Sequence, residues 1–184
     1  MSNPPTSAHD ESSPAPPHFE EELLDKHFEY TYSSGWTYQV GLPPAFDVRA
    51  LFFWVKNHQR IVYGISGGPM SGRNNFQTAH YQRVRPNLWQ ISWLEETNTV
   101  VSMVLDIDEK RITTFMSFSH GHWARNDEAK GYKRDEGKLD KWRELSVDTP
   151  QAWERTQIPE QAHIDKIYNG RGDLEDIDMS WPTL

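Results

Sequence analysis

Two tyrosines near the start of the chain have a spacing that could form a ligand site. The stretch 27–32 reads His-Phe-Glu-Tyr-Thr-Tyr, and a polar turn separates it from Trp36 and Tyr38. In a β-strand, residues two apart lie on one face, so Tyr30 and Tyr32 would direct their phenol groups to one place. Buried phenols need hydrogen-bond partners, which the polar ends of a ligand could supply. The spacing also fits structural tyrosines bonded to backbone or water.

A glutamate follows two apolar residues at the same alternate spacing. Ile91, Trp93 and Glu95 would share one face of a strand. Burial in an apolar environment raises the pKa of a carboxyl group, so a glutamate on such a face could act as a general acid. If the strand ended at Leu94, Glu95 would instead lie in a solvated turn beside Glu96.

Arg73 closes a glycine-rich segment, residues 67–73, which reads Gly-Gly-Pro-Met-Ser-Gly-Arg. The segment lacks the lysine and hydroxyl of a phosphate-binding loop. We interpret its glycines as a tight turn that places Arg73, either in a site or in a surface salt bridge. Two phenols, an arginine, an acid and an aromatic lining together suit a small, flat, anionic aromatic ligand.

The pair His120 and His122 could in principle bind a metal ion. No third ligand follows at a suitable spacing, so we interpret the pair as a loop anchor or a surface feature and predict no metal site. The sequence also lacks a nucleophile elbow and a dinucleotide fingerprint, and we predict no cofactor.

The elements that would position these residues are short strands with alternating apolar residues and hairpin-like connections. Such strands without intervening helices predict an all-β fold, an antiparallel barrel of about eight strands with room for one small ligand. The expected strands are 27–32, 36–40, 52–56, 60–66, 76–84, 88–95, 98–106 and 111–119.

The remaining chain divides into a tail, an insertion and a C-terminal part. Residues 1–22 are rich in proline, serine and acids, which predicts a disordered tail before a single domain, 23–184. Pro43 and Pro44 predict an insertion loop at about 40–52, because proline is excluded from central strands. We expect a polar loop over 119–134, one short helix over 135–146, a second within 150–168, and a surface-packed end over 170–184.

Composition limits the classes of function. The 184 residues suit one domain, and 12% are aromatic, including eight tryptophans. The net charge of −8 argues against a nucleic-acid partner. The chain has no cysteine, no signal-peptide pattern and no bilayer-spanning segment. We therefore expect a cytoplasmic protein without a membrane partner.

Several short segments resemble the phenolic acid decarboxylase family, which includes ferulate and p-coumarate decarboxylases, in a form similar to its fungal members. The matching pieces occur in family order from about His27 to Trp123, and the likeness is weaker beyond. They are Tyr30-Thr31-Tyr32, Gly35-Trp36-x-Tyr38, Ile61-Val62-Tyr63, Gly68 to Arg73, Trp89 to Thr97 and Lys110-Arg111-Ile112. The N-terminal tail and the 40–52 insertion depart from the family pattern.

The resemblance implies a lipocalin-like barrel, a homodimer, and non-oxidative decarboxylation of 4-hydroxycinnamic acids without a cofactor. The family's functional positions fall on Tyr30, Tyr32, Tyr38, Arg73 and Glu95. We expect the first two to polarise the substrate phenol, Arg73 and Tyr38 to hold its carboxylate, and Glu95 to protonate its double bond. The reverse orientation, with the tyrosines on the carboxylate, is the alternative.

Four aromatic and aliphatic residues complete the expected substrate-binding lining, namely Trp36, Tyr38, Ile91 and Trp93. The competing function is a non-catalytic barrel that binds small aromatic acids. A further alternative is an enzyme that the 40–52 insertion inactivates, because the insertion follows directly after Tyr38.

Overall fold

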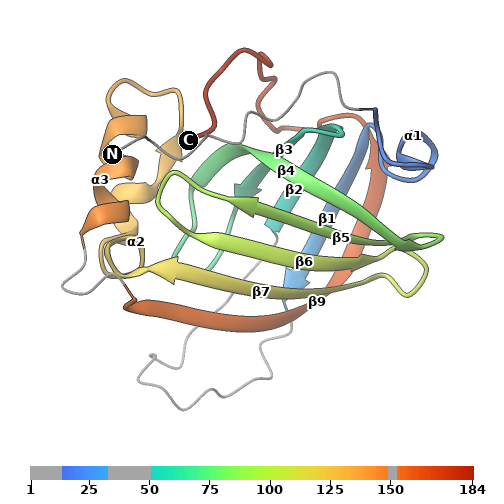
Figure 1. Cartoon of the computed structure of the whole chain (residues 1–184), viewed down its shortest axis with the longest axis horizontal. Helices are drawn as coiled ribbons and strands as arrows, with labels where there is room; N and C mark the ends of the chain where they lie inside the picture. Colours follow the sequence, from blue (N-terminus) through green and yellow to red (C-terminus); the bar gives the residue numbers. More distant parts are fainter. Residues whose placement is uncertain (1–13, 33–50, 149–152) are drawn as a thin grey trace, which may run out of the picture.

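The computed structural model describes residues 14–32, 51–148 and 153–184, which form a curled β-sheet with a few short helices (Figure 1). Its main strands are β1 (Lys26–Tyr32), β2 (Leu51–Asn57), β3 (Arg60–Ile65), β4 (Arg73–Arg85), β5 (Leu88–Leu94), β6 (Val100–Asp106), β7 (Arg111–Ser119) and β9 (Arg155–Asn169). Their order is β3-β2-β1-β9-β7-β6-β5-β4, all neighbours are antiparallel, and pairing of β3 with β4 closes the ring. The predicted all-β, lipocalin-like antiparallel barrel is confirmed.

Alternation of side chains explains why these segments form a barrel. In β5, Trp89, Ile91 and Trp93 are buried in the interior, whereas Gln90 and Ser92 lie half-buried on the outer face. Aromatic and β-branched residues fit such a pleated, half-buried surface. The burial of alternate residues on most strands builds one aromatic and aliphatic core inside the barrel.

The hairpin turns between the central strands occur where the sequence predicts them. Asn87, Asn98 and Lys110 adopt left-handed conformations with φ of 55°, 60° and 49°. Asparagine tolerates this region better than most residues, because its short polar side chain bonds locally. These turns help to set the register in which Trp93 pairs with Ala79 of β4, and Glu95 follows the end of β5.

The prediction of a second helix within 150–168 is wrong, because residues 155–169 form β9. This strand pairs with β7 on one side and β1 on the other. A register shift leaves Asp165 without a partner in β1, so Ala162, Ile164 and Ile167 all pack on the core. These three residues are separated by two and then three positions, which resembles the spacing of apolar residues in a helix. Among the described residues, only β7 pairs with the part of β9 that contains Pro159, and proline is tolerated at such an edge.

Helix α1 (Phe19–Glu22) closes one end of the barrel (Figure 1). Phe19 is 1% exposed and makes edge-to-face contacts with Tyr81 and Trp89, at centroid distances of 5.1 and 6.1 Å. Ordered, packed structure thus extends into the last residues of the predicted tail, whose residues 1–13 lie outside the described part of the chain.

Short elements after β7 cover the opposite end (Figure 1). They are α2 (His120–Ala124), η1 (Asn126–Ala129), β8 (Gly131–Tyr132) and α3 (Lys138–Val147). The helix predicted over 135–146 corresponds to α3, whose Trp142 and Leu145 are fully buried. The segment predicted as a polar loop, 119–134, instead contains α2, η1 and β8.

The C-terminal segment packs on the outer surface of the barrel, as predicted. Leu174 and Ile177 bury against Val62 and Phe76, whose side chains point outward from β3 and β4. The ring of Trp181 lies 5.9 Å from that of Phe76. The outer face of β4 is therefore shielded from water around Phe76.

Several predictions fall outside the described residues. These are the strand 36–40, most of the insertion 40–52, and the side chains of Trp36 and Tyr38. The last two residues of the predicted insertion belong to β2. Within the described ranges, none of the helices combines the length and apolarity needed to cross a bilayer.

Candidate active site

The glycine turn before β4 brings Arg73 into the barrel interior. Gly72 has φ +87°, a conformation that favours glycine. Its backbone N–H donates to Ile65 at 2.8 Å, and the N–H of Arg73 donates to Met70 at 3.2 Å. The predicted role of this turn in placing Arg73 is confirmed, and the surface salt-bridge alternative is wrong, because Arg73 is only 1% exposed.

Arg73 and Glu95 form a buried ion pair at the end of the barrel that α2 and α3 cover. Arg73 Nη2 donates to Glu95 Oε2 at 3.0 Å. The hydroxyl of Tyr63 donates to Glu95 Oε1 at 2.5 Å, and Trp93 Nε1 lies 3.4 Å from the same oxygen. Strand β5 does end at Leu94, as in the alternative, but Glu95 is only 6% exposed, so the solvated position that the alternative expected is wrong.

A second carboxylate, that of Glu96, also contacts the guanidinium group of Arg73. Arg73 Nη2 donates to Glu96 Oε1 at 2.5 Å, and Asn75 Nδ2 donates to the same oxygen at 3.0 Å. The other oxygen accepts a hydrogen bond from Gln77 Nε2 and pairs with Lys133 Nζ at 3.0 Å. All these side chains are almost fully buried. The site thus contains two carboxylates and two cations removed from water.

The charges in this cluster change the titration of its members. Burial raises the pKa of Glu96, but the charges of Arg73 and Lys133 outweigh burial and lower it below its usual value. Burial lowers the pKa of Lys133 to about 8 despite the attraction of Glu96. Burial and the charge of Glu95 hold the pKa of Tyr63 well above the usual value, so its hydroxyl stays a donor.

Besides its carboxylate partners, the guanidinium group of Arg73 contacts a backbone carbonyl and an aromatic ring. Its Nη1 donates to the carbonyl of Ala129 at 2.9 Å, and its carbon lies 3.9 Å from the ring centroid of Trp142. Such fixation by a carbonyl and an aromatic face orients the planar fork. Among the described residues, its buried Nε–H has no hydrogen-bond partner, and it could donate to a ligand oxygen.

Tyr30 and Tyr32 lie side by side in the interior, as their spacing predicts. Their rings are perpendicular with centroids 5.5 Å apart, and both side chains are buried. The hydroxyl of Tyr32 donates to Thr114 at 3.3 Å. Burial raises the pKa of Tyr32 to about 12. Burial also raises the pKa of Tyr30 well above the usual value, and the neighbouring Tyr63 adds to that increase.

A third carboxylate, Glu160 of β9, lies on the tyrosine side of the interior. It pairs in register with Thr114, and it contributes to the raised pKa of Tyr32. Burial raises the pKa of Glu160 itself. Its Oε2 is buried without a hydrogen-bond partner in the part of the chain that the structure describes. This oxygen could accept a proton or a hydrogen bond from a ligand.

The two predicted lining residues that the structure describes face the interior. Ile91 is fully buried, and the ring of Trp93 lies 5.6 Å from that of Tyr63. They connect the tyrosine side of the interior to the Arg73–Glu95 pair. The other two predicted lining residues, Trp36 and Tyr38, lie outside the described residues.

The two histidines of the predicted pair have different surroundings. His122 is buried in α2, and its Nδ1 lies 2.7 Å from the hydroxyl of Thr99, whereas His120 is partly exposed near Glu154. Any side chain at Gly121 would collide with the backbone of α3. The motif thus anchors α2 on the barrel. No group of three or more potential metal ligands occurs among the described residues.

Sequence reasoning missed five residues of the buried cluster. One signal was available for two of them, since Asn75 and Gln77 follow Arg73 at alternate positions of the same strand. Lys133 had no such signal, because it lies in a segment that was predicted to be a polar loop. The missed residues are Tyr63, Asn75, Gln77, Glu96 and Lys133.

The barrel interior therefore brings together an acid, a fixed guanidinium and phenol donors, groups that could bind an anionic aromatic ligand. Residues 20–181 match the family described as phenolic acid decarboxylase (PAD). The chain belongs to the phenolic acid decarboxylase family.

Two curated relatives are bacterial. The chain is 25% identical over 158 residues to "Phenolic acid decarboxylase PadC" of Bacillus subtilis, covering 85% of this chain and 88% of that protein. It is 32% identical over 88 residues to "Probable phenolic acid decarboxylase" of Vibrio cholerae, covering 47% of this chain and 43% of that protein. The likeness to fungal members stays a prediction.

Proposed function

We propose that this protein catalyses the cofactor-independent, non-oxidative decarboxylation of 4-hydroxycinnamic acids, such as p-coumaric, ferulic and caffeic acid, to 4-vinylphenols and CO2. The observation that carries the proposal is the Arg73–Glu95 pair, joined at 3.0 Å and buried in an aromatic interior. An acid beside a fixed cation suits proton transfer to a bound carboxylate substrate. Membership of the family supports the same reaction class.

The chemistry follows from the para-hydroxyl group of the substrate. Direct loss of CO2 would leave a carbanion on a vinyl carbon, which is too costly. Deprotonation of the phenol moves electrons through the ring and makes the carbon that bears the carboxylate basic. Protonation there gives a quinone methide, and loss of CO2 restores the phenolate. The substrate is its own electron sink, so the reaction requires no cofactor.

In this proposal each side of the interior has one task. Tyr30 and Tyr32 polarise the phenol, while Arg73 holds the carboxylate and Glu95 protonates the alkene carbon. Tyr38 would assist Arg73. Ile91, Trp93 and Trp36 would contact the ring and the side chain of the substrate.

Two observations support this orientation over its reverse. Glu160 on the tyrosine side would repel a substrate carboxylate, whereas its buried oxygen could accept the phenol proton. The buried Nε–H of Arg73 offers a donor for a carboxylate on the other side.

We also propose that the protein is a cytoplasmic homodimer that associates through the outer face of β5, β6 and β7. Leu94, Val100, Val104 and Phe115 are 41%, 39%, 37% and 44% exposed on that face. The strands lie side by side in Figure 1, and the residues between these four include uncharged serines and a glutamine. An apolar, uncharged patch suits a protein interface. Light scattering should give a dimer for the native protein and a monomer for Phe115→Asp.

Turnover separates this function from its alternatives. The purified protein is mixed with p-coumaric, ferulic, caffeic and sinapic acids, and the ultraviolet change of vinylphenol formation is followed. An enzyme releases product with many turnovers, and we expect this for at least one acid. A carrier would bind these acids without releasing product. Binding without turnover would therefore contradict the proposal.

A further inference from the structure

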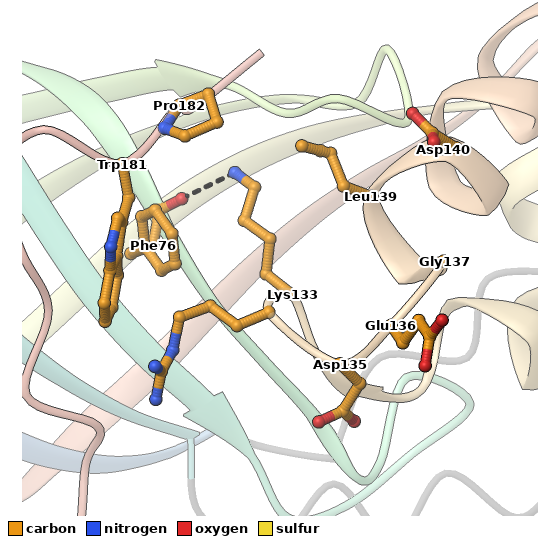
Figure 2. A pocket seen from close by; sticks show the side chains of 10 residues that line it. Phe76, Lys133, Asp135, Glu136, Gly137, Leu139, Asp140, Trp181 and Pro182 are labelled. Carbon is orange, nitrogen blue, oxygen red and sulfur yellow. Dashed lines mark hydrogen bonds between the residues drawn. The ribbon is translucent and has the colours of Figure 1, made fainter.

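Lys133 links the active site to the outer surface of the barrel. Its ammonium group pairs with Glu96 at 3.0 Å on the inner side. It donates to the carbonyl oxygens of Phe76 at 3.0 Å and Thr183 at 2.7 Å on the outer side. Figure 2 shows its side chain beside the ring of Phe76, in a pocket also lined by Trp181. Lys133 is 3% exposed, so its charge is buried with three acceptors.

The charges of the buried cluster sum to zero when both carboxylates are ionised. Arg73 and Lys133 contribute two positive charges, and Glu95 and Glu96 contribute two negative charges. A substrate carboxylate that binds Arg73 would add a third negative charge in a region with little water. An uncompensated buried charge is strongly unfavourable, and a carboxyl group gains a proton instead.

We propose that Lys133 and Glu96 are positioning residues that keep the free site neutral, so that the arrival of the substrate carboxylate draws one proton from solvent onto Glu95 and forms the general acid. This inference rests on the proposed decarboxylation. Glu96 does not take the proton, because two cations and two amides hold it ionised. Glu95 pairs with one cation, Arg73, and its other described partners are neutral donors.

The proton balance of the reaction closes on this scheme. Glu95 transfers its proton to the alkene carbon, and the bond from that carbon to the carboxylate then breaks. Its electron pair forms the vinyl double bond and returns the charge to the phenolate oxygen as neutral CO2 leaves. The proton lost by the phenol returns to the phenolate. Each turnover therefore consumes one proton, which is the proton taken up on binding. The cluster is neutral again when the product leaves.

Other groups around Glu95 do not supply the missing charge. Tyr63 from β3 stays protonated, because burial raises its pKa. His122 from α2 stays neutral, because burial and the charge of Arg73 hold its pKa well below the usual value. Thr97 contributes only a hydroxyl at 3.4 Å. Lys133 is thus the second cation of this cluster within the described residues.

The test measures proton uptake on binding of 3-(4-hydroxyphenyl)propanoic acid, a saturated analogue that cannot form the quinone methide. Calorimetric titration at pH 7 in buffers of different ionisation enthalpy gives the number of protons per ligand bound. We expect about one for the native protein, because the analogue is already ionised. A value near zero for the native protein would overturn the proposal without any variant.

Two variants change the charge count in opposite ways. Glu96→Gln leaves an excess positive charge, so proton uptake should fall to near zero while binding persists, and kcat for p-coumarate should fall on the order of 10–100-fold. Adding Lys133→Met restores the balance, so the double variant should again take up about one proton and recover part of kcat. Uptake of one proton by Glu96→Gln would contradict the proposal.

Glu29→Gln is the matched control, because Glu29 pairs with Lys166 at 2.8 Å on the outside of the barrel. Its proton count should stay at about one. Failure of this inference differs from failure of the proposed function. In the first case the native protein turns over p-coumarate with the wrong proton count, and in the second it shows no turnover at all.

Discussion

Glutamates lie at opposite ends of β4 and β5, with the half-buried Glu22 at one end and the buried Glu95 and Glu96 at the other, and their surroundings differ. At the α1 end, Glu22 accepts hydrogen bonds from Arg83 at 2.5 Å, Trp89 Nε1 at 2.7 Å and the backbone of Asn87 at 3.0 Å. One carboxylate meets one cation, and the aromatic ring of Phe19 fills the barrel beside it. These contacts fasten α1 over the barrel end.

At the other end, two carboxylates share one guanidinium. Arg73 contacts both Glu95 and Glu96, and Lys133 supplies the second cation from outside the barrel. A pair whose partners satisfy each other serves structure, whereas a shared cation can exchange one partner for a substrate carboxylate. Residue type alone therefore does not separate an ion pair that fastens a helix from one that we propose to act in catalysis. The surroundings decide the role.

The largest expected effect is the loss of the acid. Glu95→Gln keeps the shape and the hydrogen-bond acceptor but cannot donate a carboxyl proton. The rate of vinylphenol formation should fall on the order of 10²–10⁴-fold. Thermal unfolding should show that the fold is intact. Near-native activity of this variant would remove Glu95 from the mechanism.

A smaller effect is expected when the shared cation changes shape. Arg73→Lys keeps the charge but loses the planar fork that can contact two carboxylates and the substrate. Loss of one or two charge-assisted hydrogen bonds predicts a decrease in kcat/KM on the order of 10–100-fold. Arg83→Lys at the α1 end is the control and should change kcat/KM little. Equal losses in both variants would erase the distinction between the two ends.

The pH dependence should report the second cation. The pKa of Lys133 is lowered by burial to about 8. Below this pH the residue is charged and the cluster is neutral, whereas above it the cluster gains a negative charge that opposes substrate binding. Because binding also takes up one proton, kcat/KM already falls by roughly tenfold per pH unit near pH 7, and this decrease should become steeper above about pH 8, where the proton of Lys133 is required as well. In Lys133→Arg the steeper part should move to higher pH, and an unchanged profile would exclude Lys133 as its source.

The smallest effect on catalysis is expected at the α1 end. Glu22→Gln should lower the free energy of unfolding by about 1–3 kcal/mol, because buried donors lose a charged acceptor, while kcat stays near the native value. Hydrogen bonding from Arg83 lowers the pKa of Glu22 from its usual 4.5. Its contribution is therefore present above this pH and is lost as the pH falls through the lowered value. Chemical unfolding at pH 7 and pH 3.5 should show a smaller difference between native and variant protein at the lower pH.

The barrel could be predicted because alternation and turn residues act locally. Trp89, Ile91 and Trp93 specify β5, and Asn87 and Asn98 specify its ends. The C-terminal strand was predicted wrongly, because the bulge at Asp165 depends on pairing with β1, which lies far away in the sequence.

In the site, too, one contact could be expected from the sequence and another could not. The contact of Arg73 with Glu95 agrees with the positions expected from the family resemblance. The contact of Lys133 with Glu96 depends on how the segment after β7 folds back over β4, and no spacing in the sequence encodes it. Buried charge networks of this kind arise from tertiary packing and become visible only in three dimensions.

The most direct test of the central claim compares two substrates that differ by one oxygen atom. The native protein is incubated with p-coumaric acid and with cinnamic acid, and the products are separated by chromatography. We expect release of 4-vinylphenol and CO2 from p-coumaric acid and no styrene from cinnamic acid, because only the first can form a quinone methide. Turnover of cinnamic acid at a comparable rate, or no turnover of p-coumaric acid, would contradict the proposed mechanism.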